Sequence, residues 1–145
     1  RSYMLLETQF KRVFEEATRL KGVTGENMLV LLERRLDNVV YRMGFASSRL
    51  QSRQLVQHGH VIINGKRVDI PSYQVKVNDI VEIKEDFKNN AILEDAIKLS
   101  KAVGSVPQWV EVDYEKRNGK IIRLPERKDI EPIFNEQAVV ELYSK

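Results

Sequence analysis

The dipeptide Asn64-Gly65, which lies between Val61–Ile63 and the run "KRVDI", is the local feature that most restricts how this chain can fold. A two-residue hairpin turn of type I′ needs positive φ angles at both central residues, and Asn followed by Gly tolerates them best. Residues 61–70 are therefore predicted to form an antiparallel β-hairpin.

The segments on either side of this hairpin complete a small predicted unit. Ser48 and Gln51 have the spacing of a capping box, which predicts a short helix that starts after Ser48 and ends before Gly59. After the hairpin, "YQVKVNDIVEI" predicts two short strands around Asn78-Asp79. Residues 46–84 should thus contain one helix and several antiparallel strands.

Two longer helices are predicted before this unit. In "ETQFKRVFEEATRLKG" and in "TGENMLVLLERRLDNVVYRMG", apolar residues recur every three or four positions, as on one side of an amphipathic helix. Thr8 and Gly22 are predicted to cap the first helix, and Thr24 and Gly44 to bound the second. The short connection between them predicts a helical hairpin.

The last third of the chain gives a mixed pattern. "NAILEDAIKLSKAV" predicts a helix, "WVEVDY" a strand, and Asn118-Gly119 a second hairpin turn before "KIIRL". We expect a final helix from near Pro132, although "AVVELY" alone is also compatible with a strand. The apolar side of the first of these helices is predicted to consist of Ile92, Ala96, Ile97 and Leu99. Together these elements predict an α+β fold.

Positive charge is concentrated in the middle of the chain. The net charge is only +3, and residues 1–33 are balanced, with five basic and five acidic side chains. Residues 34–76 carry eight basic and two acidic side chains, whereas residues 77–145 carry eleven and fourteen. Such a block indicates a surface for a polyanion, with a merely solvated surface as the alternative.

The most informative cations lie in the helix and hairpin of the central unit. Arg49 and Arg53 are four residues apart and should project from one side of the helix, while Lys66 and Arg67 leave the hairpin turn. Guanidinium groups bind phosphate through two parallel hydrogen bonds and keep their charge. Side-chain amides in the same segment both donate and accept, which suits base edges and ribose 2′-hydroxyls: Gln54, Gln57 and Asn64. A nucleic-acid surface is favoured over polar side chains that contact only water.

Other kinds of site gain little support from the residues. His58 and His60 flank a glycine, but the chain has no cysteine and Asp69 could add only one ligand, so no metal is expected. Turn hydrogen bonds or contacts with phosphate and bases suit these histidines better. No catalytic triad, glycine-rich phosphate loop or carboxylate pair in a predicted cleft is found, so we expect neither catalysis nor a cofactor. No apolar run reaches the roughly 18 residues of a membrane span, and no signal peptide is indicated. Trp109 and Tyr114 could stack on bases, although core positions fit their alternating strand better.

The segment "RLDNVVYRMGFASSRLQSRQLVQHGHVIINGKRVDIPSY" resembles the RNA-binding module named after the fourth protein of the small ribosomal subunit. The flanks "FKRVFEEATRLKGVTGENMLVLLERRLDN" and "RLPERKDIEPIFNEQAVVELYSK" resemble the bacterial type of this ribosomal protein family itself. The resemblance extends over nearly the whole chain, and it implies both a domain organisation and a function.

The implied organisation is a discontinuous helical domain, residues 1–45 and 126–145, with residues 46–125 inserted as a helix plus antiparallel-sheet domain. The RNA-binding motif would occupy about 34–84. The family binds small-subunit rRNA at a multi-helix junction, nucleates assembly of the subunit body and affects translational accuracy. The implied partners are this rRNA, neighbouring small-subunit proteins (the fifth protein above all) and mRNA at the entry channel, in the cytoplasm and without a membrane.

Matching positions in the family's motif give the expected RNA-binding residues. They are Arg34, Arg35, Arg42, Ser48, Arg49, Arg53, Gln54, His58, His60, Asn64, Lys66, Arg67, Tyr73 and Lys76. Gln57 stands where the family often has a basic residue, so a phosphate contact is in doubt there. The family also usually has a basic N-terminal extension, which this chain is expected to lack because it starts after it.

Two other classes of protein carry the same module. One is the RNA-modifying or aminoacylating enzymes, which need a separate catalytic domain with a nucleophilic aspartate or a nucleotide site. The other is quality-control RNA binders that use the module alone. The helical flanks and the short remainder after residue 84 favour the ribosomal protein over both.

Overall fold

The computed structural model describes residues 7–19, 24–104 and 106–130. Contacts divide the chain into a first unit, Arg1–Glu33 with Pro125–Lys145, and a second unit, Arg34–Leu124. The helices and strands are α1 (Glu7–Arg19), α2 (Thr24–Glu33), α3 (Leu36–Arg42), α4 (Arg49–Gln57), β1 (Val61–Ile63), β2 (Lys66–Arg67), β3 (Ile80–Ile83), η1 (Glu85–Phe87), α5 (Ala91–Val103), β4 (Val110–Asp113), β5 (Asn118–Ile121) and η2 (Arg127–Asp129).

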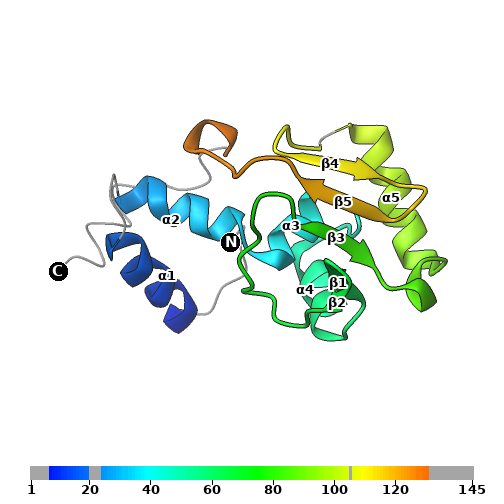
Figure 1. The fold of residues 1–145 in the computed structure, drawn as a ribbon, viewed down its shortest axis with the longest axis horizontal. Helices are drawn as coiled ribbons and strands as arrows, with labels where there is room; N and C mark the ends of the chain where they lie inside the picture. Colours follow the sequence, from blue (N-terminus) through cyan, green and yellow to red (C-terminus); the bar gives the residue numbers. More distant parts are fainter. Residues whose placement is uncertain (1–6, 20–23, 105, 131–145) are drawn as a thin grey trace. The chain divides into compact units, whose positions relative to one another are not determined.

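The first unit contains the pair α1 and α2, which pack against each other (Figure 1). Ala17 of α1 and Leu29 and Leu32 of α2 are fully buried, and the Asn27 side-chain amide donates to the Ala17 carbonyl at 3.2 Å. The predicted helical hairpin is confirmed. Thr8 lies inside α1 rather than at its cap. The predicted cap at Gly22 and the predicted helix near Pro132 lie outside the described residues.

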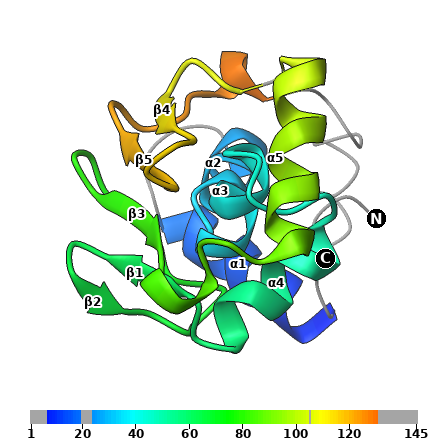
Figure 2. The same cartoon turned by 90° about the vertical axis from the view of Figure 1, so that its right-hand side faces the viewer.

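The second unit is built on a five-stranded antiparallel sheet with strand order β2-β1-β3-β5-β4. Helices α3, α4 and α5 lie on one side of this sheet, as Figure 2 shows. In β1 and β3 the burial alternates along the strand, because successive side chains point to opposite faces. The predicted α+β fold is confirmed.

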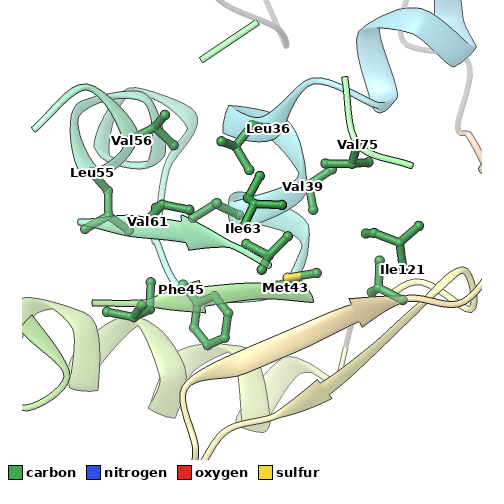
Figure 3. Close-up of a cluster of buried hydrophobic side chains, with 14 of the residues drawn as sticks. Leu36, Val39, Met43, Phe45, Leu55, Val56, Val61, Ile63, Val75 and Ile121 are labelled. Carbon is green, nitrogen blue, oxygen red and sulfur yellow. The ribbon is translucent and has the colours of Figure 1, made fainter. Parts of the chain in front are cut away.

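The hydrophobic core of the second unit fills the space between the helices and the sheet. Val39 of α3, Met43 at the end of that helix, Val61 of β1 and Ile121 of β5 are fully buried and lie together in Figure 3. The Ser52 hydroxyl of α4 donates to the Asp37 carbonyl of α3, which joins the two helices inside the core. Helix α4 and the strand that follows it are thus held on a rigid base.

The single helix predicted before Gly44 is wrong, because the chain breaks it into α2 and α3. Arg35 has an extended backbone, with φ −62° and ψ 139°, and forms an isolated β-bridge with Gln74. The Leu36 amide donates to the Tyr73 carbonyl at 2.8 Å, and the Val75 amide donates to the Arg34 carbonyl at 3.1 Å. Backbone groups that a continuous helix would use are therefore bonded to the segment 71–75.

Three further predictions need correction. The second hairpin forms, but Asn118-Gly119 lies inside β5, opposite Asp113 and Val112, and the turn falls at residues 114–117. Before β3, the chain forms only the bridge at Gln74 in place of a strand. Helix α5 buries Leu93 with Ala96 and Ile97, whereas Ile92 and Leu99 are exposed. The predicted domain division at residues 45 and 46 stays a prediction, although contacts group α3 with the second unit.

Candidate nucleic-acid interface

Helix α4 starts as the sequence predicts. Ser48 is its N-cap, with an extended backbone, and the Ser48 hydroxyl accepts a hydrogen bond from the Gln51 amide at 3.1 Å. The Gln51 side-chain oxygen accepts from the amide of Ser47 at 2.7 Å rather than from that of Ser48. Both bonds satisfy backbone donors near the first turn, so the start of α4 is fixed without any ligand.

Three predicted residues meet where α3 ends and α4 begins. The Arg49 guanidinium lies 4.6 Å from the ring centroid of Tyr41 and donates to the Asn38 side-chain oxygen at 3.3 Å. Arg42 approaches the same ring, at 6.0 Å. Contacts with an aromatic ring orient a guanidinium while leaving its charge intact. The structure therefore brings Arg42 and Arg49 to one aromatic ring, and the cap residue Ser48 directly precedes Arg49 in the chain.

The next turn of α4 carries two further predicted residues. Arg53 is half-buried and Gln54 is exposed. Arg53 follows Arg49 by four residues, so the two side chains leave the same side of the helix. This placement agrees with the prediction that Arg49 and Arg53 project from one side of the helix.

The hairpin turn presents the next pair of cations. Asn64 and Gly65 have φ angles of 51° and 84°, as a type I′ turn requires. Lys66 and Arg67 follow in β2, at the edge of the sheet, and both are exposed. Arg67 is 3.6 Å from Asp69 in an ion pair whose side chains are both more than half exposed. Ion pairs this exposed contribute little to the stability of the fold. Arg67 can therefore leave Asp69 and bind a phosphate at little cost.

A buried carboxylate behind this turn was missed by the sequence reasoning. Asp79 is only 6% exposed, and its carboxylate accepts from the Asn64 side-chain amide at 2.9 Å and from the Lys76 backbone amide at 2.8 Å. The Tyr73 hydroxyl contacts the same carboxylate at 3.5 Å. Asp79 thereby joins three of the predicted residues into one cluster, and only the neighbouring turn signal Asn78-Asp79 pointed to this position.

The bonds within this cluster determine which hydrogen-bonding groups of Asn64 and Tyr73 are available to a ligand. The Asn64 amide donates to Asp79 and its oxygen accepts from the Ile80 backbone amide at 2.9 Å, so this side chain chiefly fixes the turn. Burial, followed by the charge and hydrogen bond of Asp79, raises the pKa of Tyr73. The Tyr73 hydroxyl is therefore available as a hydrogen-bond donor. The Lys76 side chain is exposed.

The two histidines form a corner between α4 and β1. His58 caps the end of α4 and is exposed, while His60 stacks on Phe87 with 4.0 Å between ring centroids. The pKa of His60 is lowered, first by desolvation and then by nearby cations, although Asp86 opposes this. Gly59, with φ 79°, lets the Arg67 guanidinium approach closely, since a Cβ there would lie 2.4 Å from its Nε atom.

Arg34 and Arg35 are placed differently from the other predicted residues. The Arg34 guanidinium donates twice to the Val75 carbonyl, at 3.2 and 3.0 Å, and desolvation lowers its pKa. Arg35 is 3% exposed and makes a bidentate ion pair with Asp37, with both N–O distances 3.1 Å. Both side chains therefore hold the start of the second unit together, and their expected contact with RNA stays a prediction.

The described residues contain neither a group of metal-ligating side chains nor a membrane-spanning helix. Nowhere in this part of the chain do three or more His, Cys, Asp or Glu side chains gather as they would around a metal ion. Over the same residues, no helix has both the length and the hydrophobicity needed to cross a bilayer.

A capped helix followed by a hairpin with outward cations is the framework of a small RNA-binding module. The family profile described as "S4 domain" matches residues 34–81, and the profile described as "Ribosomal protein S4/S9 N-terminal domain" matches residues 1–33. The class defined by fold and site is thus an RNA-binding module of the S4 type within a longer chain.

Comparison with curated proteins identifies the family. The small ribosomal subunit protein uS4 of Thermodesulfovibrio yellowstonii is 54% identical over all 145 residues, which correspond to 69% of that protein. The protein of the same name from Leptospira biflexa is 52% identical with the same coverage, and that from Hahella chejuensis is 52% identical with 70% of its length covered. The chain belongs to the uS4 family of small ribosomal subunit proteins, which confirms the resemblance found in the sequence.

Proposed function

We propose that this protein is a structural constituent of the small ribosomal subunit and binds small-subunit rRNA through α4 and the β1–β2 hairpin. The observation that carries the proposal is that cations from separate elements, Arg53, Lys66 and Arg67, lie on a platform whose local geometry is fixed by internal hydrogen bonds. Membership of the uS4 family supports it over the full length of the chain.

Recognition in this proposal depends on the spacing of phosphates. The cap at Ser48 fixes the start of α4, and Asp79 fixes the turn at Asn64. Cations held in this way match only phosphates whose separations are set by a folded RNA, while Gln54 and His58 are exposed beside them for base edges or ribose hydroxyls. The fixed guanidinium of Arg49 adds a contact at the start of the helix.

The family resemblance supplies the proposed RNA target, the protein partners and the effect on translation. The RNA target is a multi-helix junction of the small-subunit rRNA, where binding nucleates assembly of the subunit body. In the finished ribosome, in the cytoplasm, the protein contacts neighbouring small-subunit proteins (the fifth protein above all) and mRNA at its entry channel, and so affects translational accuracy. Relatives named as ribosomal proteins match the whole chain, which favours this function over an RNA-modifying enzyme or a quality-control binder.

Alanine substitutions test whether α4 and the β1–β2 hairpin bind small-subunit rRNA. Arg53→Ala and Lys66→Ala should each weaken binding to small-subunit rRNA transcribed in vitro. Each should also reduce the slope of log affinity against log salt concentration by about 0.7–0.9, because one phosphate contact is lost. Lys116→Ala removes an exposed cation from the β4–β5 turn and is the matched control. If Arg53→Ala and Lys66→Ala behave like Lys116→Ala, this face does not bind the RNA.

A further inference from the structure

A pocket of about 200 Å³ opens near the start of α4, and no residue of that helix belongs to its lining. Residues 41–47 supply part of its lining and helix α5 supplies the rest. Its apolar surface comes from Ala46, Ala96, Leu99 and Val103. Its polar surface comes from Tyr41, Arg42, Ser47 and Ser100. The pocket lies entirely within the second unit.

Gly44 shapes this pocket. Its φ angle is +90°, and a Cβ at this position would lie 2.2 Å from the Ser100 Oγ atom and 2.9 Å from the Tyr114 hydroxyl. The Ser100 and Tyr114 hydroxyls are themselves hydrogen bonded at 2.8 Å. Glycine thus allows α5 to approach the end of α3 closely, and the hydroxyl pair fixes this approach. The pocket is part of the packed structure of the unit.

The charge around the pocket favours an anionic ligand. Among the described residues that line it, Arg42 is the charged one, and no carboxylate takes part. Arg49 does not line the pocket, but its guanidinium lies 4.6 Å from the ring centroid of the lining residue Tyr41. A neutral apolar side chain from a protein would not use these two cations, whereas a phosphate beside the pocket would pair with them.

The size and surface of the pocket suit a single flat ring. Pockets for drug-sized ligands measure roughly 300–1,000 Å³, so this one holds less than such a ligand. The aliphatic side chains of Leu99 and Val103 can contact the face of a base, and hydroxyls such as that of Ser47 can bond its edge. Proteins that recognise RNA commonly take up unstacked bases in this way.

We propose that this pocket binds one unpaired nucleotide that is extruded from the bound RNA, with its base against α5 and its phosphate at Arg42. The proposal rests on the proposed function, and it names the kind of RNA feature that the protein selects. A junction with an unpaired nucleotide at the right distance from the cations on α4 would bind better than one without it.

The test compares substitutions of the same kind on one helix. Leu99 and Val103 line the pocket and are 54% and 65% exposed, while Ile92, on the same helix, lies outside the lining and is 57% exposed. Leu99→Glu and Val103→Glu in the full chain should weaken binding to small-subunit rRNA about tenfold or more, as expected when one stacked base is displaced. Ile92→Glu adds the same charge and should change binding no more than about threefold.

The outcomes separate the two proposals. If the unsubstituted chain does not bind this rRNA, the proposed function fails. If it binds and the three variants weaken binding equally, only the pocket proposal is overturned. The same holds if Leu99→Glu and Val103→Glu bind RNA normally but enter particles reconstituted with the other small-subunit proteins poorly, because the pocket would then hold a protein.

A second measurement needs no variant. Nucleoside monophosphates titrated into the unsubstituted, ¹⁵N-labelled chain should shift the amide resonances of Gly44, Ser47 and Ser100. Ribose 5-phosphate and inorganic phosphate, which lack a base, should not shift them. Equal shifts with inorganic phosphate, or no shifts with any nucleotide, would overturn the proposal.

Discussion

Removing the carboxylate of Asp79 should destabilise the second unit and loosen the hairpin turn that carries Lys66. This side chain is 6% exposed and accepts two short hydrogen bonds, from the Asn64 side chain at 2.9 Å and from the Lys76 backbone at 2.8 Å. Asp79→Ala leaves both donors without this partner. The turn then loses the bond that ties it to the segment before β3.

The size of the effect follows from these contacts. A hydrogen bond to a charged group contributes about 1.5–3 kcal/mol, so two short ones give about 3–6 kcal/mol. The 3.5 Å contact with Tyr73 is too long to add much. Removing the carboxylate also removes the cost of burying its charge, which offsets part of the loss. We therefore expect Asp79→Ala to lower the free energy of unfolding by about 3 kcal/mol.

Urea denaturation followed by the fluorescence of Trp109 measures this directly, because Trp109 is the one tryptophan in the chain and is fully buried in the second unit. Asp69→Ala is the matched control, since it removes an exposed carboxylate from a surface ion pair and should cost less than about 1 kcal/mol. If Asp79→Ala costs no more than Asp69→Ala, the buried carboxylate does not hold the turn.

Two further effects should be measurable with the same denaturation assay. Ser48→Ala removes the cap of α4 and should cost about 1 kcal/mol, whereas Ser72→Ala, at an exposed turn, should cost less than about 0.5 kcal/mol; equal costs would contradict the capping role. Desolvation beside Phe87 lowers the pKa of His60 below 6.5, so the folded state binds fewer protons than the unfolded state. This contribution to stability is complete above pH 6.5 and is lost as the pH falls through the folded pKa, so His60→Gln should reduce the loss of stability between about pH 7.5 and about pH 5.5. An unchanged loss in that variant would show that His60 does not cause it.

The parts of the fold that the sequence predicts well depend on local interactions. Asn64-Gly65 forms its turn because the two φ angles are a property of the two residues themselves. Ser48 caps α4 because its hydroxyl reaches an amide three residues away. The same is true of the repeating apolar positions that produce α1 and α5, although the exact side of α5 that is buried depends on its neighbours.

The features that were mispredicted depend on distant partners. The break between α2 and α3 exists because the segment 71–75 bonds the backbone of Arg34 and Leu36, and no periodicity in the helix reveals that segment. Asn118-Gly119 has the composition of a turn, but its pairing with β4 and β3 places it within a central strand. Here tertiary pairing outweighs local preference.

In the candidate site, too, the sequence predicts what depends on local interactions and misses what depends on distant partners. Residue type and spacing identified the exposed cations Lys66 and Arg67, because basic side chains beside a turn usually stay in solvent. They could not distinguish these from Arg35, which is buried only because Asp37 is there to pair with it. Asp79 was missed because its partners lie up to 15 residues away, and they meet only when β1 pairs with β3.

The bridge between Arg35 and Gln74 has a consequence for how such a unit can be inherited. The first backbone groups of the second unit are hydrogen bonded to a loop of the same unit. The start of this unit is therefore held by its own residues. A gene segment that encodes residues 34–124 also encodes the loop that forms these bonds. The bonds therefore stay available when the segment is joined to another coding sequence. A different coding sequence can then be joined before Arg34 by recombination while these bonds stay the same.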